Sequence, residues 1–343
     1  MRKIRVTALT AGEHDPSRRF RVCQFADALA RRGVEVAEYH PFFSKYAAAP
    51  AARLGPLWTA AKVLARVPGV AAARFGDITW LQRELIPGRL TLENFAGRKL
   101  LFDVDDAVWT TQHGRAVERI AERSRGVVAG NEFLADYFRR RGARVWVVPT
   151  CVDTDRWRPA PRSERDAWVV GWSGTASNLK YLYEIEEPLA EFLNGRDEAR
   201  LLVVSDAEPR FEKIPRGRWQ FARWSAASEV RLAQRFDVGL MPLAATDWER
   251  GKCGCKMLTY MAVGAATIAS PVGVGGDIMR RGEVGLAATT RDDWYNALVR
   301  LYDDRALASR LGATGRRLAA EHYSVTRHAA TLAAIFRQVA EED

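Results

Sequence analysis

The sequence predicts an α/β protein with two doubly wound domains, each built on a parallel sheet, and a C-terminal helix. Short apolar segments alternate with helical patterns, and a polar stretch with two prolines interrupts the alternation. The chain also has 343 residues, more than one domain usually holds. The predicted domains are 1–150 and 168–323, joined by a linker over 151–167 and followed by a helix over 324–343. We expect the domains to face each other across a cleft.

The strands predicted in the first domain are short and apolar: 4–9, 34–40, 77–82, 99–104, 126–130 and 145–149. Apolar residues at helical spacing predict a helix over 20–32 that stops at Gly33. A second helix should begin after Asn131, whose side chain can cap it, and end at Gly142. Strands that alternate with helices in this way are typical of a parallel sheet covered on both faces.

The second domain repeats the pattern, with strands predicted at 168–173, 200–206, 219–224, 237–243 and 266–270. No charge occurs from 257 to 276, a run of 20 residues that is long enough to suggest a membrane span. Gly264 and Pro271 divide this run, so we interpret it as a helix over 257–263, a buried strand, and a loop over 271–276.

The positive charge is confined to the first half of the chain. Residues 1–150 hold 25 Lys and Arg against 15 Asp and Glu, whereas residues 151–343 hold 27 of each kind. The charge is dispersed and no nucleic-acid-binding motif occurs, so an anionic lipid or an acidic glycan is favoured over nucleic acid as a partner. A solvated basic surface with no partner is the preferred interpretation. Residues 53–75 are basic and partly amphipathic. They predict either a helix packed on its own domain or one that makes a peripheral contact with an anionic membrane.

The cysteines and the N-terminus indicate a cytoplasmic protein, with the inner face of the membrane as a second possibility. The four cysteines are scattered, and Cys253 and Cys255 are too close together for the usual zinc-binding pair. The first 15 residues become polar too early for a signal peptide. We expect neither a metal nor a resident cofactor.

Two glycine-containing turns are suited to phosphate. Arg250, Gly251, Lys252, Cys253 and Gly254 come before a helix that carries Lys256, and so combine cations, close backbone approach and a helix N-terminus. The second turn follows the strand at 168–173 and contains Ser173, Gly174 and Thr175, with Lys180 on the next helix. Both turns belong to the predicted second domain, which strengthens the prediction of a phosphate site there.

Two further groups lie at strand ends of the first domain. Asp103, Asp105 and Asp106 could hold a divalent metal, supply a nucleophilic aspartate, or line a cleft on the acceptor side; the last interpretation is preferred. Gly12 follows the first strand, and Arg18 and Arg19 come before the first helix, where they would suit an anionic acceptor.

Nine segments in order resemble family-4 glycosyltransferases of the two-domain GT-B fold, in which both domains are Rossmann-like. They are PSRRFRVCQFADALARRG, DITWLQRE, LLFDVDDAVW, VVAGNEFLADYFRRRG, VPTCVDTDRW, GWSGTASNLKYL, DVGLMPL, ERGKCGCKMLTYMAVG and SPVGVGGDI. The resemblance implies transfer of a sugar, with retention and without a metal, from a nucleotide-diphosphate sugar to an acceptor hydroxyl. The acceptor could be a glycan, lipid-linked or a small molecule.

The resemblance also implies roles for individual residues. The donor phosphates and sugar would contact Arg250 to Gly254, with Lys256, Ser173, Gly174, Thr175 and Lys180 beside the diphosphate and Trp224 near the base. Asp105 and Asp106 would face the reaction centre, and Glu249, Arg250 and Lys252 complete the predicted catalytic group.

The chain departs from the family pattern at two acidic positions. Gly251 and Thr259 stand where many members have glutamates, of which the first commonly contacts the sugar and the second binds ribose. Glu249 is a candidate substitute for the first. Lys252 or Lys256 could compensate for an arginine that is replaced by the Trp172-Ser173-Gly174 turn. The missing glutamates leave open a second hypothesis, a catalytically inactive binding protein in a glycan-assembly complex.

Overall fold

The computed structural model describes residues 2–13, 15–111, 114–161 and 167–342. Contacts divide the chain into two compact units. The first unit comprises Met1–Cys151, Arg250–Cys253 and Val325–Asp343, and the second comprises Val152–Glu249 and Gly254–Ser324. The predicted linker therefore falls within the second unit from Val152 onward, and its residues 162–166 lie outside the described residues.

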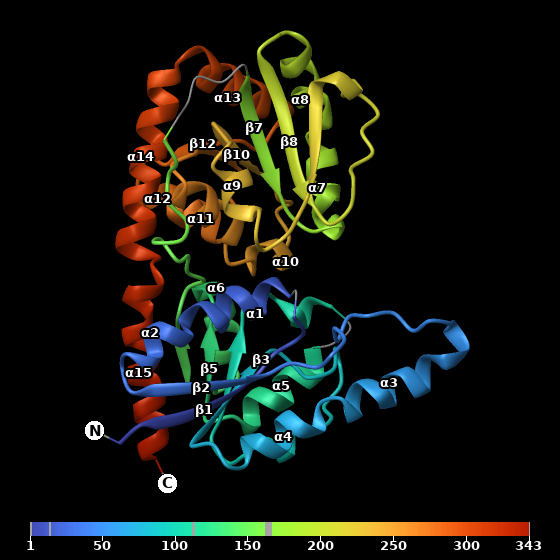
Figure 1. The fold of residues 1–343 in the computed structure, drawn as a ribbon, viewed down its shortest axis with the longest axis vertical. Coiled ribbons are helices and arrows are strands. Elements are labelled where there is room, and N and C mark those ends of the chain that lie inside the picture. The colour runs from blue at the N-terminus through green and yellow to red at the C-terminus, as the bar shows by residue number, and fades with distance from the viewer. Residues whose placement is uncertain (1, 14, 112–113, 162–166, 343) are drawn as a thin grey trace. The chain divides into compact units, whose positions relative to one another are not determined.

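The first unit is built on a six-stranded parallel sheet in the order β2-β1-β3-β4-β5-β6 (Figure 1). Its strands are β1 (Ile4–Leu9), β2 (Val34–Tyr39), β3 (Ile78–Gln82), β4 (Leu100–Val104), β5 (Gly126–Ala129) and β6 (Val145–Val147). β3 and β4 are buried along their whole length, which explains why apolar residues occur on both faces of each strand. The neighbours of β1 are β2 and β3, so the direction of strand order reverses beside β1.

The helices of the first unit are α1 (Pro16–Arg21), α2 (Ala26–Ala30), α3 (Gly55–Leu64), α4 (Val67–Ala73), α5 (Gly114–Arg123), α6 (Glu132–Arg139) and α15 (Val325–Glu341). The single helix predicted over 20–32 is wrong. It is broken at Val22, whose φ of −122° leaves the helical range, and a 3₁₀ turn (Cys23–Phe25) follows. Val22, Phe25 and Leu29 bury the same side of both pieces, so the helical spacing continues across the break.

The three remaining helical predictions for the first unit are the helix after Asn131, the segment over 53–75 and the C-terminal helix. Asn131 caps α6 by accepting a hydrogen bond from the Leu134 N–H at 2.9 Å, as predicted. The segment over 53–75 forms two helices instead of one. Pro68 lies in the first turn of α4 and has no N–H to donate to the Leu64 carbonyl, so the hydrogen bonds of α3 cannot continue through this position. α15 packs on the core of the first unit, where Phe336 meets Trp80 with ring centroids 5.2 Å apart.

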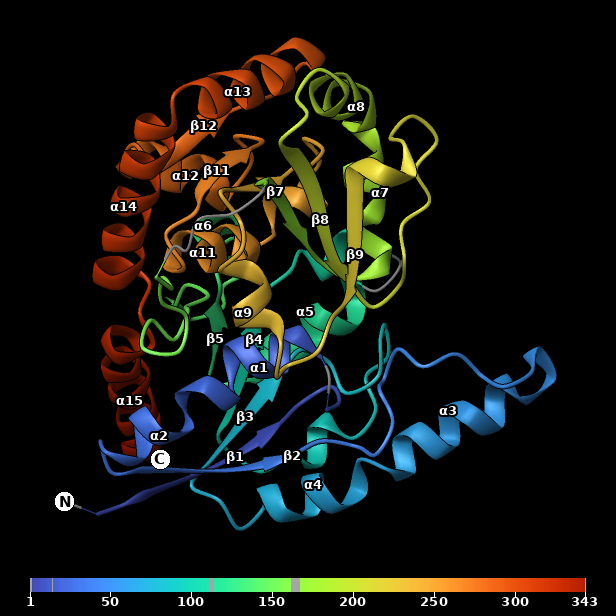
Figure 2. The ribbon, with the colours of Figure 1, turned by 45° about the horizontal axis from the view of Figure 1, so that its top comes forward.

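The second unit has its own six-stranded parallel sheet, in the order β12-β11-β10-β7-β8-β9 (Figure 2). The strands are β7 (Trp168–Ser173), β8 (Ala199–Ser205), β9 (Trp219–Arg223), β10 (Val238–Met241), β11 (Ala266–Ala269) and β12 (Gly285–Ala287). This is the strand order of dinucleotide-binding Rossmann domains, and it reverses between β7 and β10. Ligands of such sheets bind outside the carboxyl ends of the strands at the reversal.

The helices of the second unit are α7 (Leu179–Glu184), α8 (Glu186–Asn194), α9 (Glu229–Ala233), α10 (Asp247–Arg250), α11 (Cys255–Ala262), α12 (Val274–Arg281), α13 (Arg291–Asp303) and α14 (Arg305–His322). The uncharged run from 257 to 276 is divided between α11, β11 and the start of α12. The loop predicted over 271–276 is wrong from Val274 onward, because Gly273 is the N-cap and α12 begins there. No helix in the described part of the chain is long and apolar enough to cross a bilayer.

Candidate functional site

The carboxyl edge of the second sheet gathers a glycine turn and two helix N-termini. Gly174 directly follows β7, at the point where the strand order reverses. α11 begins after Gly254, which has a φ of 68°, and α12 begins after Gly273. Neither cap residue accepts a side-chain hydrogen bond from its helix. The N-terminal N–H groups of both helices therefore point toward the edge where such sheets bind anionic ligands.

Lys256 is held beside Gly174 by an aromatic ring. Its Nζ lies 4.4 Å from the centroid of Trp172, a distance at which a cation is attracted to the face of the ring. A Cβ atom on Gly174 would come within 2.7 Å of the Trp172 ring and 2.8 Å of the Lys256 Nζ. Glycine at position 174 thus leaves room for the ammonium group, and any side chain there would displace it.

The turn after β7 is fixed by further hydrogen bonds. The Ser173 N–H donates to the Tyr260 hydroxyl at 2.9 Å, and burial raises the pKa of Tyr260, so this hydroxyl stays protonated. The Thr175 hydroxyl lies 3.0 Å from that of Ser177 and accepts from the Asn178 amide at 2.7 Å. Lys180 lies 4.8 Å from the ring centroid of Tyr181. These contacts hold the backbone of the turn in one conformation.

One predicted catalytic residue, Glu249, and two predicted donor-binding residues, Thr259 and Trp224, take part in internal hydrogen bonds of the second unit. The buried Glu249 carboxylate accepts from the hydroxyls of Tyr181 and Thr246. The Thr259 hydroxyl donates to the Lys256 carbonyl at 2.7 Å, within the first turns of α11. The Trp224 indole N–H donates to Glu229 at 3.1 Å. A sugar or ribose contact by Glu249 or Thr259 stays a prediction.

In the first unit, Arg83 brings Asp105 and Asp106 together just beyond β3 and β4. Its guanidinium donates to Asp105 at 2.6 Å and also to Asp106, to the Ser17 hydroxyl at 3.1 Å and to the Tyr46 hydroxyl at 3.1 Å. Arg83 has a φ of 57°, the one positive value outside glycine among the described residues. Such a backbone costs free energy and persists where surrounding contacts impose it, often at functional sites.

The two carboxylates that share Arg83 differ in their protonation behaviour. Burial pushes the pKa of Asp105 upward, but the Arg83 guanidinium outweighs it, so the net pKa is lowered. Burial raises the pKa of Asp106, and the nearby Asp105 charge adds to this effect against the opposing charges of Arg83 and Lys252. Neighbouring carboxylates with divergent pKa values are a frequent feature of acid–base sites.

Asp103 is committed to a buried ion pair instead. Arg21 donates to both of its carboxylate oxygens at 2.9 Å, and the Trp80 indole N–H adds a bond of 3.2 Å. The side chains of Arg21 and Asp103 are 2% and 0% exposed. The described residues contain no cluster of three or more His, Cys, Asp or Glu with the arrangement of a metal site. Asp103 therefore joins α1 to the sheet, a structural role that the sequence prediction did not include.

Residues 250–253 of the basic turn are grouped with the first unit. The Asn131 amide donates to the Gly251 carbonyl at 3.0 Å, and the Cys253 thiol donates to the Asp105 carbonyl at 3.2 Å. A Cβ on Gly251 would lie 2.5 Å from the Cβ of Ala107 and 2.7 Å from its backbone nitrogen. The position where related enzymes are expected to carry a glutamate therefore has no space for a side chain in this chain.

The predicted acceptor-side residues lie near β1 but do not form one group. Gly12 is buried, and a Cβ there would approach the Ser44 backbone to 3.1 Å. Arg18 forms an ion pair with Glu38 and donates to the Glu13 carbonyl at 2.8 Å. The Arg19 guanidinium lies 5.4 Å from the ring centroid of Phe20. Arg18 is thus engaged by a carboxylate of its own unit, which the sequence did not indicate.

The residues that sequence reasoning missed are those that hold the site residues in place: Arg83, Asn131 toward Gly251, Trp172 and Tyr181. Only Arg83 offered a signal, as a charged residue directly after a predicted strand.

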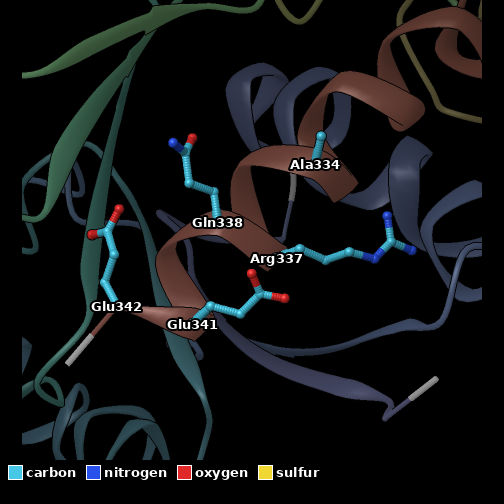
Figure 3. A pocket seen from close by; sticks show the side chains of 5 residues that line it. All are labelled: Ala334, Arg337, Gln338, Glu341 and Glu342. Carbon is cyan, nitrogen blue, oxygen red and sulfur yellow. The ribbon is translucent and has the colours of Figure 1, made fainter.

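A shallow hollow on α15 contains none of the predicted site residues. It is lined by Ala334, Arg337, Gln338, Glu341 and Glu342 (Figure 3). Arg337 donates to the Arg32 carbonyl and Glu342 pairs with Arg144, and both partners precede a strand of the first sheet. The hollow therefore lies at the amino ends of the strands, opposite the edge where such sheets bind ligands.

Comparison with known proteins supports the assignment suggested by fold and site. Residues 168–304 match the model of the family described as Glycosyl transferases group 1. The matched segment comprises most of the second unit, which is similar to glycosyltransferases of this group. A search of curated proteins found no match.

Three solved structures show how far the fold extends. Sucrose-phosphate synthase from Thermosynechococcus elongatus is 15% identical, with a TM-score of 0.75 over 98% of this chain and 99% of that one. Anabaena Alr3699/HepE, in complex with UDP and glucose, is 13% identical, with a TM-score of 0.71 over 98% and 100%. WaaG, a glycosyltransferase involved in lipopolysaccharide biosynthesis, is 14% identical, with a TM-score of 0.71 over 96% and 99%. At these identities the likeness shows the fold alone, which confirms the two-domain Rossmann-like fold and the resemblance to GT-B glycosyltransferases.

Proposed function

We propose that the protein transfers a sugar from a nucleotide-diphosphate sugar to an acceptor hydroxyl. The observation that carries this proposal is the grouping of Gly174, Lys256 and the α11 N-terminus at the strand-order reversal of the second sheet. A glycine that admits close approach, a positioned cation and the N–H groups of a helix N-terminus together suit a diphosphate. The family match over residues 168–304 and the UDP complex of a structural neighbour agree with this ligand class.

The diphosphate would leave as the bond to the sugar breaks, and negative charge develops on the leaving oxygen. Cations fixed near that oxygen lower the barrier. Lys256 and Lys180 are the proposed cations of the second unit, and Arg250 and Lys252 those of the basic turn. The acceptor hydroxyl then attacks from the face that the leaving group occupied, which retains the configuration and needs no protein nucleophile. This step is proposed to proceed without a metal.

Asp105 and Asp106 are the proposed carboxylates of the reaction centre, with Arg83 as their positioning residue. Arg83 contacts both side chains, so its loss would alter their orientation and charge together. Asp106 has the raised pKa, so of the pair it is better suited to accept a proton from the acceptor hydroxyl. The acceptor is proposed to be a glycan, a lipid-linked molecule or a small molecule bound by the first unit.

The direct test is a transfer and hydrolysis assay with UDP-, GDP- and ADP-sugars, in which released nucleotide is quantified and the anomeric product is followed by proton NMR. Lys252→Ala and Lys256→Ala should each lower turnover at least about tenfold, the effect of about 1.4 kcal/mol of transition-state stabilisation. Lys213→Ala, on the surface of the second unit, is the matched control. An inverted product would refute retention, and unchanged rates in both variants would remove these lysines from the mechanism.

One observation favours the alternative of an inactive binding protein. Gly251 has no space for the expected glutamate, and the hydroxyl of Thr259 donates to its own helix. Nucleotide binding without hydrolysis or transfer to any acceptor would support this alternative. A metal-dependent enzyme is a third hypothesis, and activity that survives a chelator would eliminate it.

A further inference from the structure

The exposed apolar side chains of this protein are concentrated in one stretch of the first unit. Nine large hydrophobic side chains are exposed among the described residues; eight of them lie between residues 39 and 75, and the ninth is Phe95. The eight are Tyr39, Phe42, Tyr46, Leu54, Leu57, Leu64, Val67 and Phe75. Isolated exposed hydrophobic residues are ordinary, but a concentration of this kind marks a surface that binds another surface.

Within this stretch, α3, α4 and the residues after α4 present apolar side chains to solvent. The spacing places the exposed Leu57, Ala60 and Leu64 on one side of α3 and the exposed Val67 and Ala71 on one side of α4, and the exposed Phe75 follows α4. We name these six residues the α3–α4 stripe. Leu57 is 69% exposed, Leu64 68% and Phe75 78%, so the largest side chains are the most open ones.

The opposite side of α3, and Arg66 just before α4, contact the protein through polar groups, whereas α4 buries Gly69, Val70 and Ala73. Lys62 donates to the Lys45 carbonyl at 2.8 Å, and the buried Arg66 donates to the Thr10 carbonyl at 3.2 Å. The Trp58 indole N–H donates to the Ala47 carbonyl at 3.0 Å. No side chain of α3 is fully buried. In this respect α3 differs from an ordinary surface helix of a globular protein, which buries its apolar side.

The charges around the α3–α4 stripe indicate which kind of surface binds it. From Tyr39 to Gly76 the chain has no Asp or Glu and five basic residues: Lys45, Arg53, Lys62, Arg66 and Arg74. Arg53 and Arg74 are exposed near the two ends of the α3–α4 stripe. An apolar stripe with basic flanks and no carboxylate matches the interface of an anionic bilayer, where apolar side chains enter the headgroup region and cations meet lipid phosphates.

We propose that the α3–α4 stripe attaches the first unit to the surface of an anionic lipid bilayer. Figures 1 and 2 show α3 reaching out beyond the sheet of the first unit, so the helix can lie along a bilayer surface. α3 has 10 residues, too few to span a bilayer, so the attachment is peripheral. It would not require sugar transfer and is tested independently of the proposed function.

The test is sedimentation of the full-length protein with vesicles of phosphatidylcholine alone and of phosphatidylcholine mixed with phosphatidylglycerol. The protein should bind the anionic vesicles, and binding should weaken as salt is raised. Leu57→Glu combined with Leu64→Glu should lower the affinity for anionic vesicles about a hundredfold, because the free energy of transferring two leucine side chains from water into the bilayer is lost. The double variant should keep the wild-type melting temperature, since neither leucine contributes to the core.

A matched control places the same two charges elsewhere on the first unit. Ala330 and Ala334 are exposed on α15 with the spacing of one helical turn, and Ala330→Glu with Ala334→Glu should bind vesicles like the wild type. Absence of vesicle binding, or equal binding by wild type and the Leu57/Leu64 variant, would overturn the proposal. So would a wild-type dimer that the Leu57/Leu64 variant converts to a monomer, because the stripe would then be an interface between two copies.

Discussion

Replacing Gly251 with alanine tests the packing of the basic turn against Ala107, in the segment after β4 of the same unit. The added Cβ would lie 2.5 Å from the Ala107 Cβ and 2.7 Å from the Ala107 nitrogen. A backbone atom cannot move aside as the end of a flexible side chain can, so either the turn or the segment after β4 must shift. Overpacking of this kind costs about 1–3 kcal/mol. For a unit of this size, that corresponds to a melting temperature lower by about 2–12 °C.

Thermal unfolding followed by circular dichroism measures this shift. The matched control is Gly217→Ala, since a Cβ at Gly217 would have no heavy atom within 4 Å. Gly251→Glu, which restores the side chain expected from the family, should be at least as unstable and should not gain activity. If Gly251→Ala melts at the wild-type temperature while the turn keeps its backbone, the reasoning about the missing glutamate is refuted.

Three further variants test other contacts. Arg21→Met should lower the free energy of unfolding in urea by about 3–5 kcal/mol, because it leaves the Asp103 carboxylate buried without its ion-pair partner. Adding Asp103→Leu should restore most of this stability, and no recovery in the double variant would contradict a simple ion pair. Burial pushes the pKa of Glu38 upward, but hydrogen bonds from Arg18 and Thr10 outweigh it and lower the pKa below the usual 4.5. The stability that the Glu38 carboxylate contributes is present above pH 4.5 and is lost as the pH falls through the lowered pKa. Arg18→Gln should therefore destabilise the protein most at neutral pH and less in acid. A difference in free energy of unfolding between wild type and variant that does not change with pH would contradict this. Trp172→Leu removes the ring beneath Lys256 and should weaken nucleotide binding about two- to tenfold in calorimetry, with unchanged affinity as the contradicting result.

The fold could be predicted from the sequence to a large extent because fully buried strands leave a clear apolar pattern. The strands from β1 to β11 were all anticipated within two residues at either end. β12 was missed because its sequence, Gly-Leu-Ala, is too short and too little branched to read as a strand. The break at Val22 was missed because periodicity records which side is buried and not whether the helix is continuous.

The candidate site was only partly predictable, for a related reason. The glycine turn after the strand at 168–173 and the basic turn before Lys256 can each be recognised in the sequence, and the structure brings Gly174 and Lys256 together in the second unit. The contact of Lys256 with the Trp172 ring and the strained backbone of Arg83 depend on tertiary contacts that no local pattern encodes. The family pattern predicts a glutamate at the position of Gly251, but only the packing of Gly251 against Ala107 explains why this chain has no acidic side chain there.

Isothermal titration of the full-length protein with UDP, GDP and ADP tests the central claim, a diphosphate site at Gly174 and Lys256, most directly. One of these nucleotides should bind, and at a hundred times its dissociation constant it should stabilise the protein by about 2.7 kcal/mol. Lys256→Ala should lower that affinity at least about tenfold, and Lys213→Ala should not change it. Failure of all three nucleotides to bind, or equal affinity of the wild type and Lys256→Ala, would contradict the claim.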